Sequence, residues 1–193
     1  LLRDADVDSQ VDLRPGLGRR RLPLHLPDRP VEQLRVHLEA DGRCPPGQLI
    51  PSSEWRFHCD ILCSFPATNA VVHVHSTYAT ALACLGEGIP AFHYMVAMAG
   101  GADIPCAAYA TFGTPDLSVN ILNALHERKA CLMANHGQVA TGRTLADAYA
   151  LAQEVENLAR QYMLARSLGP TRNLSGDEMA RVIKIIDEIA FQT

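Results

Sequence analysis

The sequence has no uninterrupted apolar run of the ~18 residues that a membrane-spanning helix needs. It also has no hydrophobic stretch of the signal-peptide type, so we expect a cytoplasmic protein that binds no membrane. Its six cysteines form no C-x-x-C pair, which predicts neither a disulfide framework nor a zinc–thiolate site. A basic excess is missing as well: the formal net charge is -4, so no nucleic-acid partner is expected.

The composition suits one globular domain with a real core. The chain has 193 residues, of which 48% are hydrophobic and 20% charged. Residues 1–34 differ from the rest, because positions 14–30 combine clustered arginines and four prolines with no helical or strand period. We therefore divide the chain into an atypical segment at 1–34, either an extended arm or a basic patch, and a single domain at 35–193.

Strand and helix patterns alternate through that domain. Strand-like segments are predicted at 70–75, 106–112, 130–134 and 138–140, after a hairpin over 36–50. Helices are predicted from Ser52 or Ser53 to Ser64, over 77–85 and 117–127, from Thr144 to Gly169, and from Ser175 onward. This interleaving predicts a layered α/β or α+β domain.

Two histidines of the first long strand pattern are placed to share one ion. His73 and His75 are separated by one residue, and strand side chains alternate, so both imidazoles should point to the same side. His136 follows a predicted strand and precedes Gly137, whose flexibility would permit a tight turn. Three protein ligands with an open fourth position are typical of catalytic zinc.

Each of these patterns also has a simpler interpretation. A pair of histidines in a strand is a weak motif alone, and Asn-His-Gly is a common turn. Glu54 and Tyr94 could handle protons beside an ion. By itself, however, Glu54 is also what a solvated carboxylate near a helix start would look like.

Five ordered blocks carry a resemblance that changes this balance: PSSEWRFH, NAVVHVHSTYATA, IPAFHYMVAMAGG, IPCAAYATFGT and ANHG. Together they resemble the class II L-fuculose-1-phosphate aldolase family, from about Val36 to Ala150 and more weakly through the two C-terminal helices. The resemblance implies a central, mainly antiparallel β-sheet flanked by helices.

The resemblance also implies a metal site. The residues matching the family's ligands are His73, His75 and His136, which would hold one zinc ion per subunit. Glu54 would contact the metal as well and serve as the proton-handling base. A divalent cation in such a site stabilises the negative charge that forms when an aldol bond breaks.

The remaining matched residues would surround the substrate. Ser52 and Ser53 would bind its phosphate, and Phe112 would line the aldehyde pocket. Tyr94 would be presented to a neighbouring subunit and give a proton to the aldehyde oxygen. The family forms cyclic homotetramers with active sites between subunits, so the same assembly is expected here.

The function implied is cleavage of L-fuculose 1-phosphate, or a related ketose 1-phosphate, to dihydroxyacetone phosphate and a short aldehyde. Alternatives on the same fold are a sugar-phosphate 4-epimerase and a dehydratase. A non-enzymatic aldolase-fold interaction module is a further alternative. Glu54 in the PSSE block favours the aldolase, and three intact ligand histidines argue against a module.

One part of the family pattern has no counterpart. The family carries a Gly-Asn-x-Ser loop and an I-T-P-[ST]-G segment that help to bind phosphate, and nothing in residues 1–34 matches them. A frame-shifted coding segment, divergence toward another substrate, and a scaffold that kept only its metal would each explain this. The nucleotide sequence separates them, because a frameshift requires the missing loop to be encoded in another frame.

Overall fold

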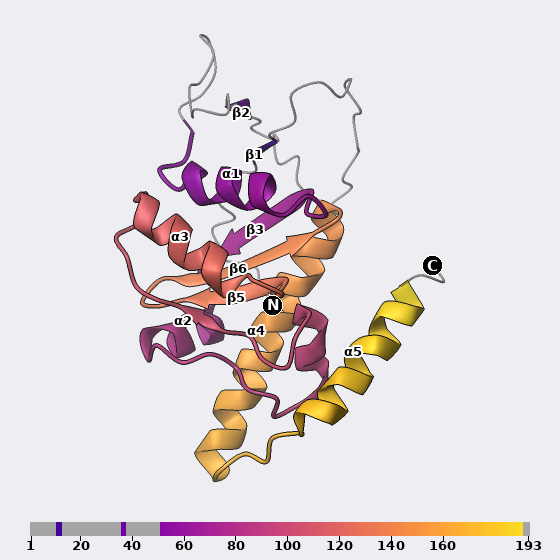
Figure 1. Ribbon diagram of the computed structural model, residues 1–193. Helices are drawn as coiled ribbons and strands as arrows, with labels where there is room; N and C mark the ends of the chain where they lie inside the picture. Colours follow the sequence, from indigo (N-terminus) through magenta and orange to yellow (C-terminus); the bar gives the residue numbers. More distant parts are fainter. Residues whose placement is uncertain (1–10, 13–35, 38–50, 191–193) are drawn as a thin grey trace, which may run out of the picture.

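A four-stranded sheet forms the centre of the molecule, in the computed structural model that describes residues 11–12, 36–37 and 51–190 (Figure 1). In spatial order its strands are β3 (Ala70–Val74), β6 (Gly137–Gly142), β5 (Ala130–Met133) and β4 (Cys106–Ala107). The first three pair antiparallel, and β4 pairs parallel with β5. The predicted layered domain with a mainly antiparallel sheet is thus confirmed.

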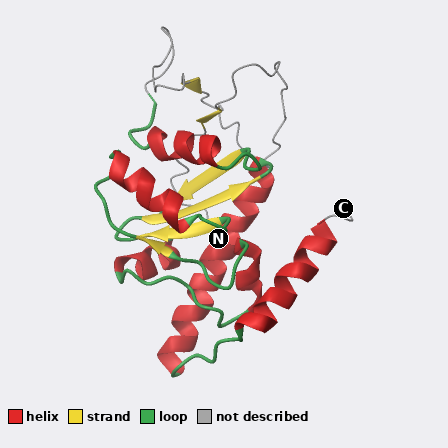
Figure 2. Cartoon of the chain, viewed as in Figure 1, coloured by secondary structure: helices red, strands yellow, loops and turns green. Residues whose placement is uncertain are grey.

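Helices cover both faces of this sheet (Figure 2). They are α1 (Trp55–Ser64), α2 (Thr77–Cys84), the 3-10 helix η1 (Tyr94–Ala99), α3 (Pro115–Ala124), α4 (Leu145–Leu168) and α5 (Gly176–Ala190). Helices α1 and α3 lie on one face and α2 and α4 on the other, while α5 packs against η1. None of the helices in the described ranges is long and apolar enough to cross a membrane.

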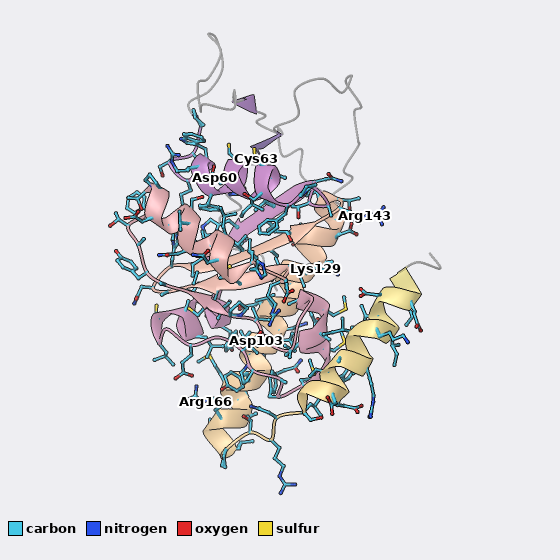
Figure 3. The ribbon with its side chains drawn as sticks, in the orientation of Figure 1. Asp60, Cys63, Asp103, Lys129, Arg143 and Arg166 are labelled. Carbon is cyan, nitrogen blue, oxygen red and sulfur yellow. The ribbon has the colours of Figure 1, made fainter. Side chains whose placement is uncertain are left out.

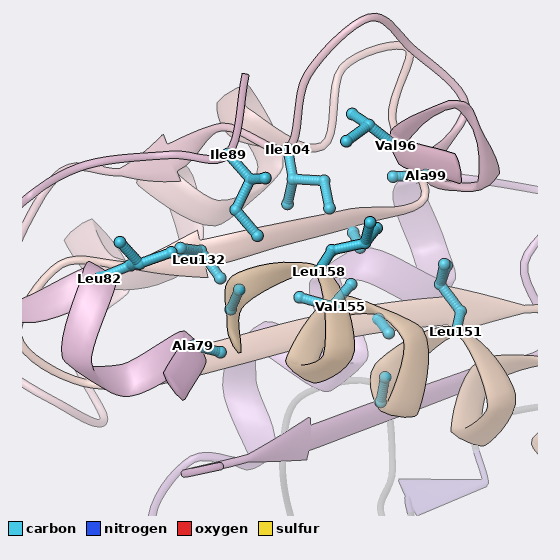
Figure 4. Close-up of a cluster of buried hydrophobic side chains, with 14 of the residues drawn as sticks. Ala79, Leu82, Ile89, Val96, Ala99, Ile104, Leu132, Leu151, Val155 and Leu158 are labelled. Carbon is cyan, nitrogen blue, oxygen red and sulfur yellow. The ribbon is translucent and has the colours of Figure 1, made fainter. Parts of the chain in front are cut away.

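Alternating strand residues supply two separate hydrophobic cores. Val72 and Val74 face α4, where Figure 4 shows Leu132, Val155 and Leu158 packed together. Val71, on the opposite face of the same strand, belongs to the core beneath α1 and α3. Because strand side chains alternate, one strand can hold both layers together.

The longest helix has the boundaries that the sequence predicts. Thr144 and Asp147 form a reciprocal capping box at its start, with N–H···O distances of 3.0 and 3.1 Å. The apolar face predicted for it is buried: Leu151, Val155, Leu158 and Tyr162. In α5, Ser175 accepts a hydrogen bond from the Glu178 backbone, as the predicted helix start requires.

The predicted strand over 106–112 is wrong beyond Ala107. Strand β4 is at the sheet edge, and among the described residues it pairs with β5 alone, so no second strand there holds the chain extended. The Ala108 carbonyl instead accepts a hydrogen bond from the Asn120 side chain, at 3.1 Å. The following helix also begins earlier than predicted, at Pro115, because Thr114 caps it by accepting from Leu117 N–H.

Most of the predicted 36–50 hairpin lies outside the described residues. Within it, β2 (Val36–His37) is a short strand that pairs parallel with β1 (Val11–Asp12). The division of the chain after residue 34 therefore stays a prediction.

Helix α1 rests on α3 through polar as well as apolar contacts. The Ser118 hydroxyl of α3 donates to Asp60 of α1 at 2.6 Å, and Figure 3 labels Asp60 on that helix. On the inner side of α1, His58 is buried and stacks on Phe57 with ring centroids 4.6 Å apart. Burial lowers the pKa of His58 to about 3, and the electrostatic contribution of nearby His73 acts in the same direction.

We predict an acid-sensitive stability term from this histidine. His58 stays neutral in the folded chain but gains a proton below its ordinary pKa of 6.5 when unfolded. The free energy of unfolding should therefore fall as the pH drops below 6.5, by up to about 1.4 kcal/mol per pH unit. Urea titrations at pH 7, 6 and 5 in chelator should show a shallower pH slope for His58→Gln. Equal slopes for both proteins would contradict this.

Candidate metal centre

Four side chains from three separate parts of the chain converge at one end of the sheet. Glu54 is the N-cap residue of α1, and His73 lies in β3. His75 follows the end of β3 by one residue, and His136 lies in the turn between β5 and β6. One ligand atom from each of the four lies within 4.8 Å of every other, so the structure brings together all the predicted metal ligands.

The distances inside this cluster are those of groups that face one another. The Nε2 atoms of His73 and His75 are 3.0 Å apart. The Glu54 carboxylate lies 3.1 Å from Nε2 of His73 through Oε2, and 3.1 Å from Nε2 of His136 through Oε1. These separations are close to the roughly 3.3 Å between two ligands of a tetrahedral ion with bonds of about 2.0–2.1 Å.

His73 has its metal-facing nitrogen fixed by its surroundings. Its Nδ1 lies 2.9 Å from the backbone oxygen of Gln138. A carbonyl only accepts, so Nδ1 carries the proton and Nε2 keeps the lone pair that points into the cluster. Phe57 of α1 packs edge-on against the same ring, with centroids 5.3 Å apart.

The electrostatics of the cluster fit a bound cation. Glu54 is only 5% exposed, and its Oε1 faces Nε2 of His136 at 3.1 Å. Burial alone would raise the pKa of Glu54, but contact with the imidazoles of His136 and His73 outweighs it and holds that pKa well below its ordinary value. A buried carboxylate beside three imidazole nitrogens is the donor set of a divalent transition metal.

The turn that presents His136 depends on two neighbours in different ways. Asn135 has a left-handed backbone, with φ of 55°, and this residue makes the tight turn. Gly137 was predicted to make it, yet its importance is one of space. A Cβ atom at Gly137 would lie 2.7 Å from the Val74 carbonyl oxygen and 2.8 Å from Cδ2 of His75.

A cavity of about 370 Å³ opens over the cluster. His75 is exposed and His136 partly exposed, whereas His73 and Glu54 form the buried floor. The cavity is lined by Ser53, Glu54, His75, Tyr109, Ala110, Phe112, Asn135 and His136. The cavity therefore gives small molecules access to the predicted ligands.

The predicted substrate residues divide into two groups. Ser53 and Phe112 line the cavity, and Ser52 lies next to it, its Oγ accepting from the Glu54 N–H at 3.3 Å. Helix α1 begins later than predicted, so Glu54 rather than a serine is its N-cap residue. Tyr94 lies on η1, is 52% exposed, and is not among the residues lining this cavity.

Two lining residues were not predicted from the sequence. Tyr109 and Asn135 both face the cavity, and Tyr109 is 63% exposed. The available signal was their place inside the family-like blocks AAYATFGT and ANHG, which also carry Phe112 and His136. The orienting carbonyl of Gln138 gave no signal, because a backbone oxygen has no sequence signature.

Residues 29–163 match the class II aldolase and adducin N-terminal domain family. The chain belongs to this family. As a class II aldolase it is a lyase, which sets aside the non-enzymatic module.

Relatives and solved structures of class II aldolases agree with that assignment. The chain is 54% identical over 156 residues to a 5-methylthioribulose-1-phosphate/5-deoxyribulose-1-phosphate aldolase of Rhodospirillum rubrum, covering 81% of this chain and 69% of the relative. It is 44% identical over 178 residues to an L-fuculose phosphate aldolase of Escherichia coli, covering 91% of this chain and 82% of that relative. A solved L-fuculose 1-phosphate aldolase superposes with a TM-score of 0.75 at 40% identity, covering 78% of this chain and 70% of that one.

We predict that Gly137→Ala weakens metal binding by about tenfold or more, since the added methyl group collides with His75 and the strand that carries it. Zinc affinity should be measured by competition with a chromophoric chelator. Gly176→Ala is the matched control, because a Cβ there meets nothing within 4 Å and the site is remote. An unchanged zinc affinity for Gly137→Ala would refute the close-contact argument.

Proposed function

We propose that this chain is a zinc-dependent aldolase that cleaves L-fuculose 1-phosphate, or a related ketose 1-phosphate, to dihydroxyacetone phosphate and a short aldehyde. The observation that carries the proposal is the convergence of Glu54 with three imidazoles on the floor of an open cavity. His73, His75, His136 and Glu54 would hold one ion per subunit. Three imidazoles with one carboxylate suit zinc, and Glu54 can yield its position to substrate.

The bound ion supplies Lewis-acid stabilisation of negative charge on oxygen. In cleavage, the proton of the C4 hydroxyl leaves, the C3–C4 electron pair passes to the dihydroxyacetone phosphate half, and C3 gains a proton. Glu54 would exchange the proton at C3, because its carboxylate lies at the cavity floor beside the ligands. In cleavage a protonated Glu54 would give its proton to C3, and in the reverse condensation the carboxylate would take that proton back. Its lowered pKa means that the anionic form prevails near neutral pH.

The start of α1 would bind the substrate phosphate. Ser53 is exposed to the cavity, and Ser52 is hydrogen-bonded within the same turn. The N-terminus of a helix carries a partial positive charge and unpaired N–H groups, which favour a phosphate there. Serine hydroxyls add donors to that site.

The opposite rim of the cavity would hold the aldehyde half. Phe112 is 64% exposed and Tyr109 63% exposed, an apolar wall that no described residue covers. The substrates named for the two relatives, a 5-methylthio or 5-deoxy ribulose phosphate and a fuculose phosphate, all end in a methyl or methylthio group. We therefore propose a ketose 1-phosphate whose aldehyde half ends in an apolar group.

Tyr94 would act in a neighbouring subunit of a homotetramer. It is not among the residues that line its own chain's cavity, and it is exposed, together with Met98 on the same 3-10 helix. From there it would serve the aldehyde oxygen of the adjacent site. The cytoplasmic location stays a prediction.

We predict chelator-sensitive release of dihydroxyacetone phosphate. Purified protein should be assayed with L-fuculose 1-phosphate, 5-deoxyribulose 1-phosphate and 5-methylthioribulose 1-phosphate, before and after metal removal. Activity should vanish on chelation and return with zinc, since the ion stabilises the charge that cleavage creates. Conversion without dihydroxyacetone phosphate would instead identify an epimerase or a dehydratase.

Glu54→Gln should lower kcat by roughly 10²–10⁴-fold, because the amide keeps the shape but cannot take up a proton. Zinc content should be measured on the same samples, to separate lost proton transfer from lost metal. The matched control is Glu178→Gln, whose carboxylate lies on the surface of α5 in an ion pair with Arg181. The role of Glu54 as base would be refuted by a zinc-loaded variant of undiminished kcat.

A further inference from the structure

A buried amide lies directly behind the metal ligands. Gln138 is fully buried in β6 and pairs across the strands with Val74, the residue between His73 and His75. Directly paired residues of antiparallel strands project to the same face, so the Gln138 side chain lies on the face opposite His73. That face is covered by α4, whose Ala152 carbonyl the amide reaches.

Both N–H groups of this amide are used. Nε2 of Gln138 donates to the Ser76 hydroxyl at 2.7 Å and to the Ala152 backbone oxygen at 3.1 Å. The carbonyl of Ala152 can only accept, so the orientation of the amide is determined by its surroundings. The other amide atom, Oε1, has no hydrogen-bond partner among the described residues.

Ser76 is available to this amide because another residue caps its helix. Ser76 is the N-cap residue of α2, but within the described structure its side chain accepts from none of the helix N–H groups. Glu156 of α4 does so instead, accepting from Tyr78 N–H at 3.0 and 3.1 Å and from Ala79 N–H at 2.9 Å. The serine hydroxyl is thereby left to accept from Gln138.

One residue thus contacts two ligand positions by separate routes. Its backbone carbonyl accepts from Nδ1 of His73, and its side chain holds Ser76, the residue that follows His75. Gln138 is also close to the third ligand in sequence: it lies at the start of β6, two residues after His136. A polar side chain among apolar neighbours lowers stability when one of its atoms stays unpaired, so packing alone gives no reason for glutamine here.

We propose that Gln138 is a positioning residue that sets the arrangement of the histidine ligands, and so the metal affinity of the site. Its own backbone carbonyl orients His73, and its side-chain amide positions His75 through the hydrogen bond to Ser76. The proposal rests on the metal-dependent function only in requiring that the site holds an ion. Its test is therefore metal affinity rather than turnover.

Gln138→Leu keeps most of the volume and removes both donated hydrogen bonds. We expect its zinc dissociation constant to rise about tenfold, the size typical of groups that orient metal ligands. The visible spectrum of the cobalt-loaded protein should change as well, because it reports ligand geometry. Ser76→Ala removes the acceptor alone and should shift zinc affinity in the same direction. The double variant should bind zinc no more weakly than Gln138→Leu, since the hydrogen bond that Ser76→Ala removes is already lost in Gln138→Leu.

Thr141→Val is the matched control. Thr141 lies in the same strand, is 6% exposed, and donates to the backbone oxygen of Lys129 at 3.0 Å. It pairs with Val71, at the opposite end of β3 from His75. Its loss should lower the urea midpoint but leave zinc affinity and the cobalt spectrum unchanged.

Zinc affinities of Gln138→Leu and Ser76→Ala within twofold of the parent would overturn the proposal, as would an equal loss in Thr141→Val. If Gln138→Leu does not fold, Ser76→Ala alone decides between these outcomes. A parent protein that binds zinc but cleaves no ketose 1-phosphate would overturn the proposed function and leave this inference standing. The two failures are therefore distinguishable.

Discussion

A carboxylate that leaves water must be compensated by positive charge or by hydrogen bonds, and Glu54 is such a carboxylate. It is 5% exposed and faces the nitrogens of His73 and His136 at 3.1 Å. Much of the surrounding structure follows from holding these groups together. Helix α1 must dock so that its N-cap residue, Glu54, meets the end of the sheet. The β5–β6 turn must place His136 beside that carboxylate.

The sheet serves packing and chemistry with the same residues. On β3, Val72 and Val74 fill the core against α4 while His73 faces α1 and the metal cluster. A change in strand register would move both sets together, because side chains alternate with a period of two. The narrow space at Gly137 also follows from the pairing of β3 with β6, because that pairing brings the β6 backbone against Val74 and His75.

The cavity combines a buried polar floor with an exposed apolar rim. The floor carries the charges that would hold an ion, and Phe112 and Tyr109 stand at the rim. Such a division suits a substrate with a phosphorylated polar half and a less polar aldehyde half.

Local patterns in the sequence determined much of this protein. Period-two spacing predicted that His73 and His75 face one ion, and the strand end before Gly137 suggested His136 as the third ligand. The capping signal at Thr144 gave the start of α4, and the family resemblance added Glu54 as a metal contact. Those predictions depend on neighbours a few residues apart, whose geometry is set by backbone preferences. Only the tertiary structure decided where the strand after Cys106 ends, which residue makes the turn before His136, and why Gly137 has no side chain. It also gave Gln138 its contacts, because the carbonyl that orients His73 is 65 residues away in sequence. Strand pairing and helix docking create such contacts, and local sequence does not encode the register that brings them together.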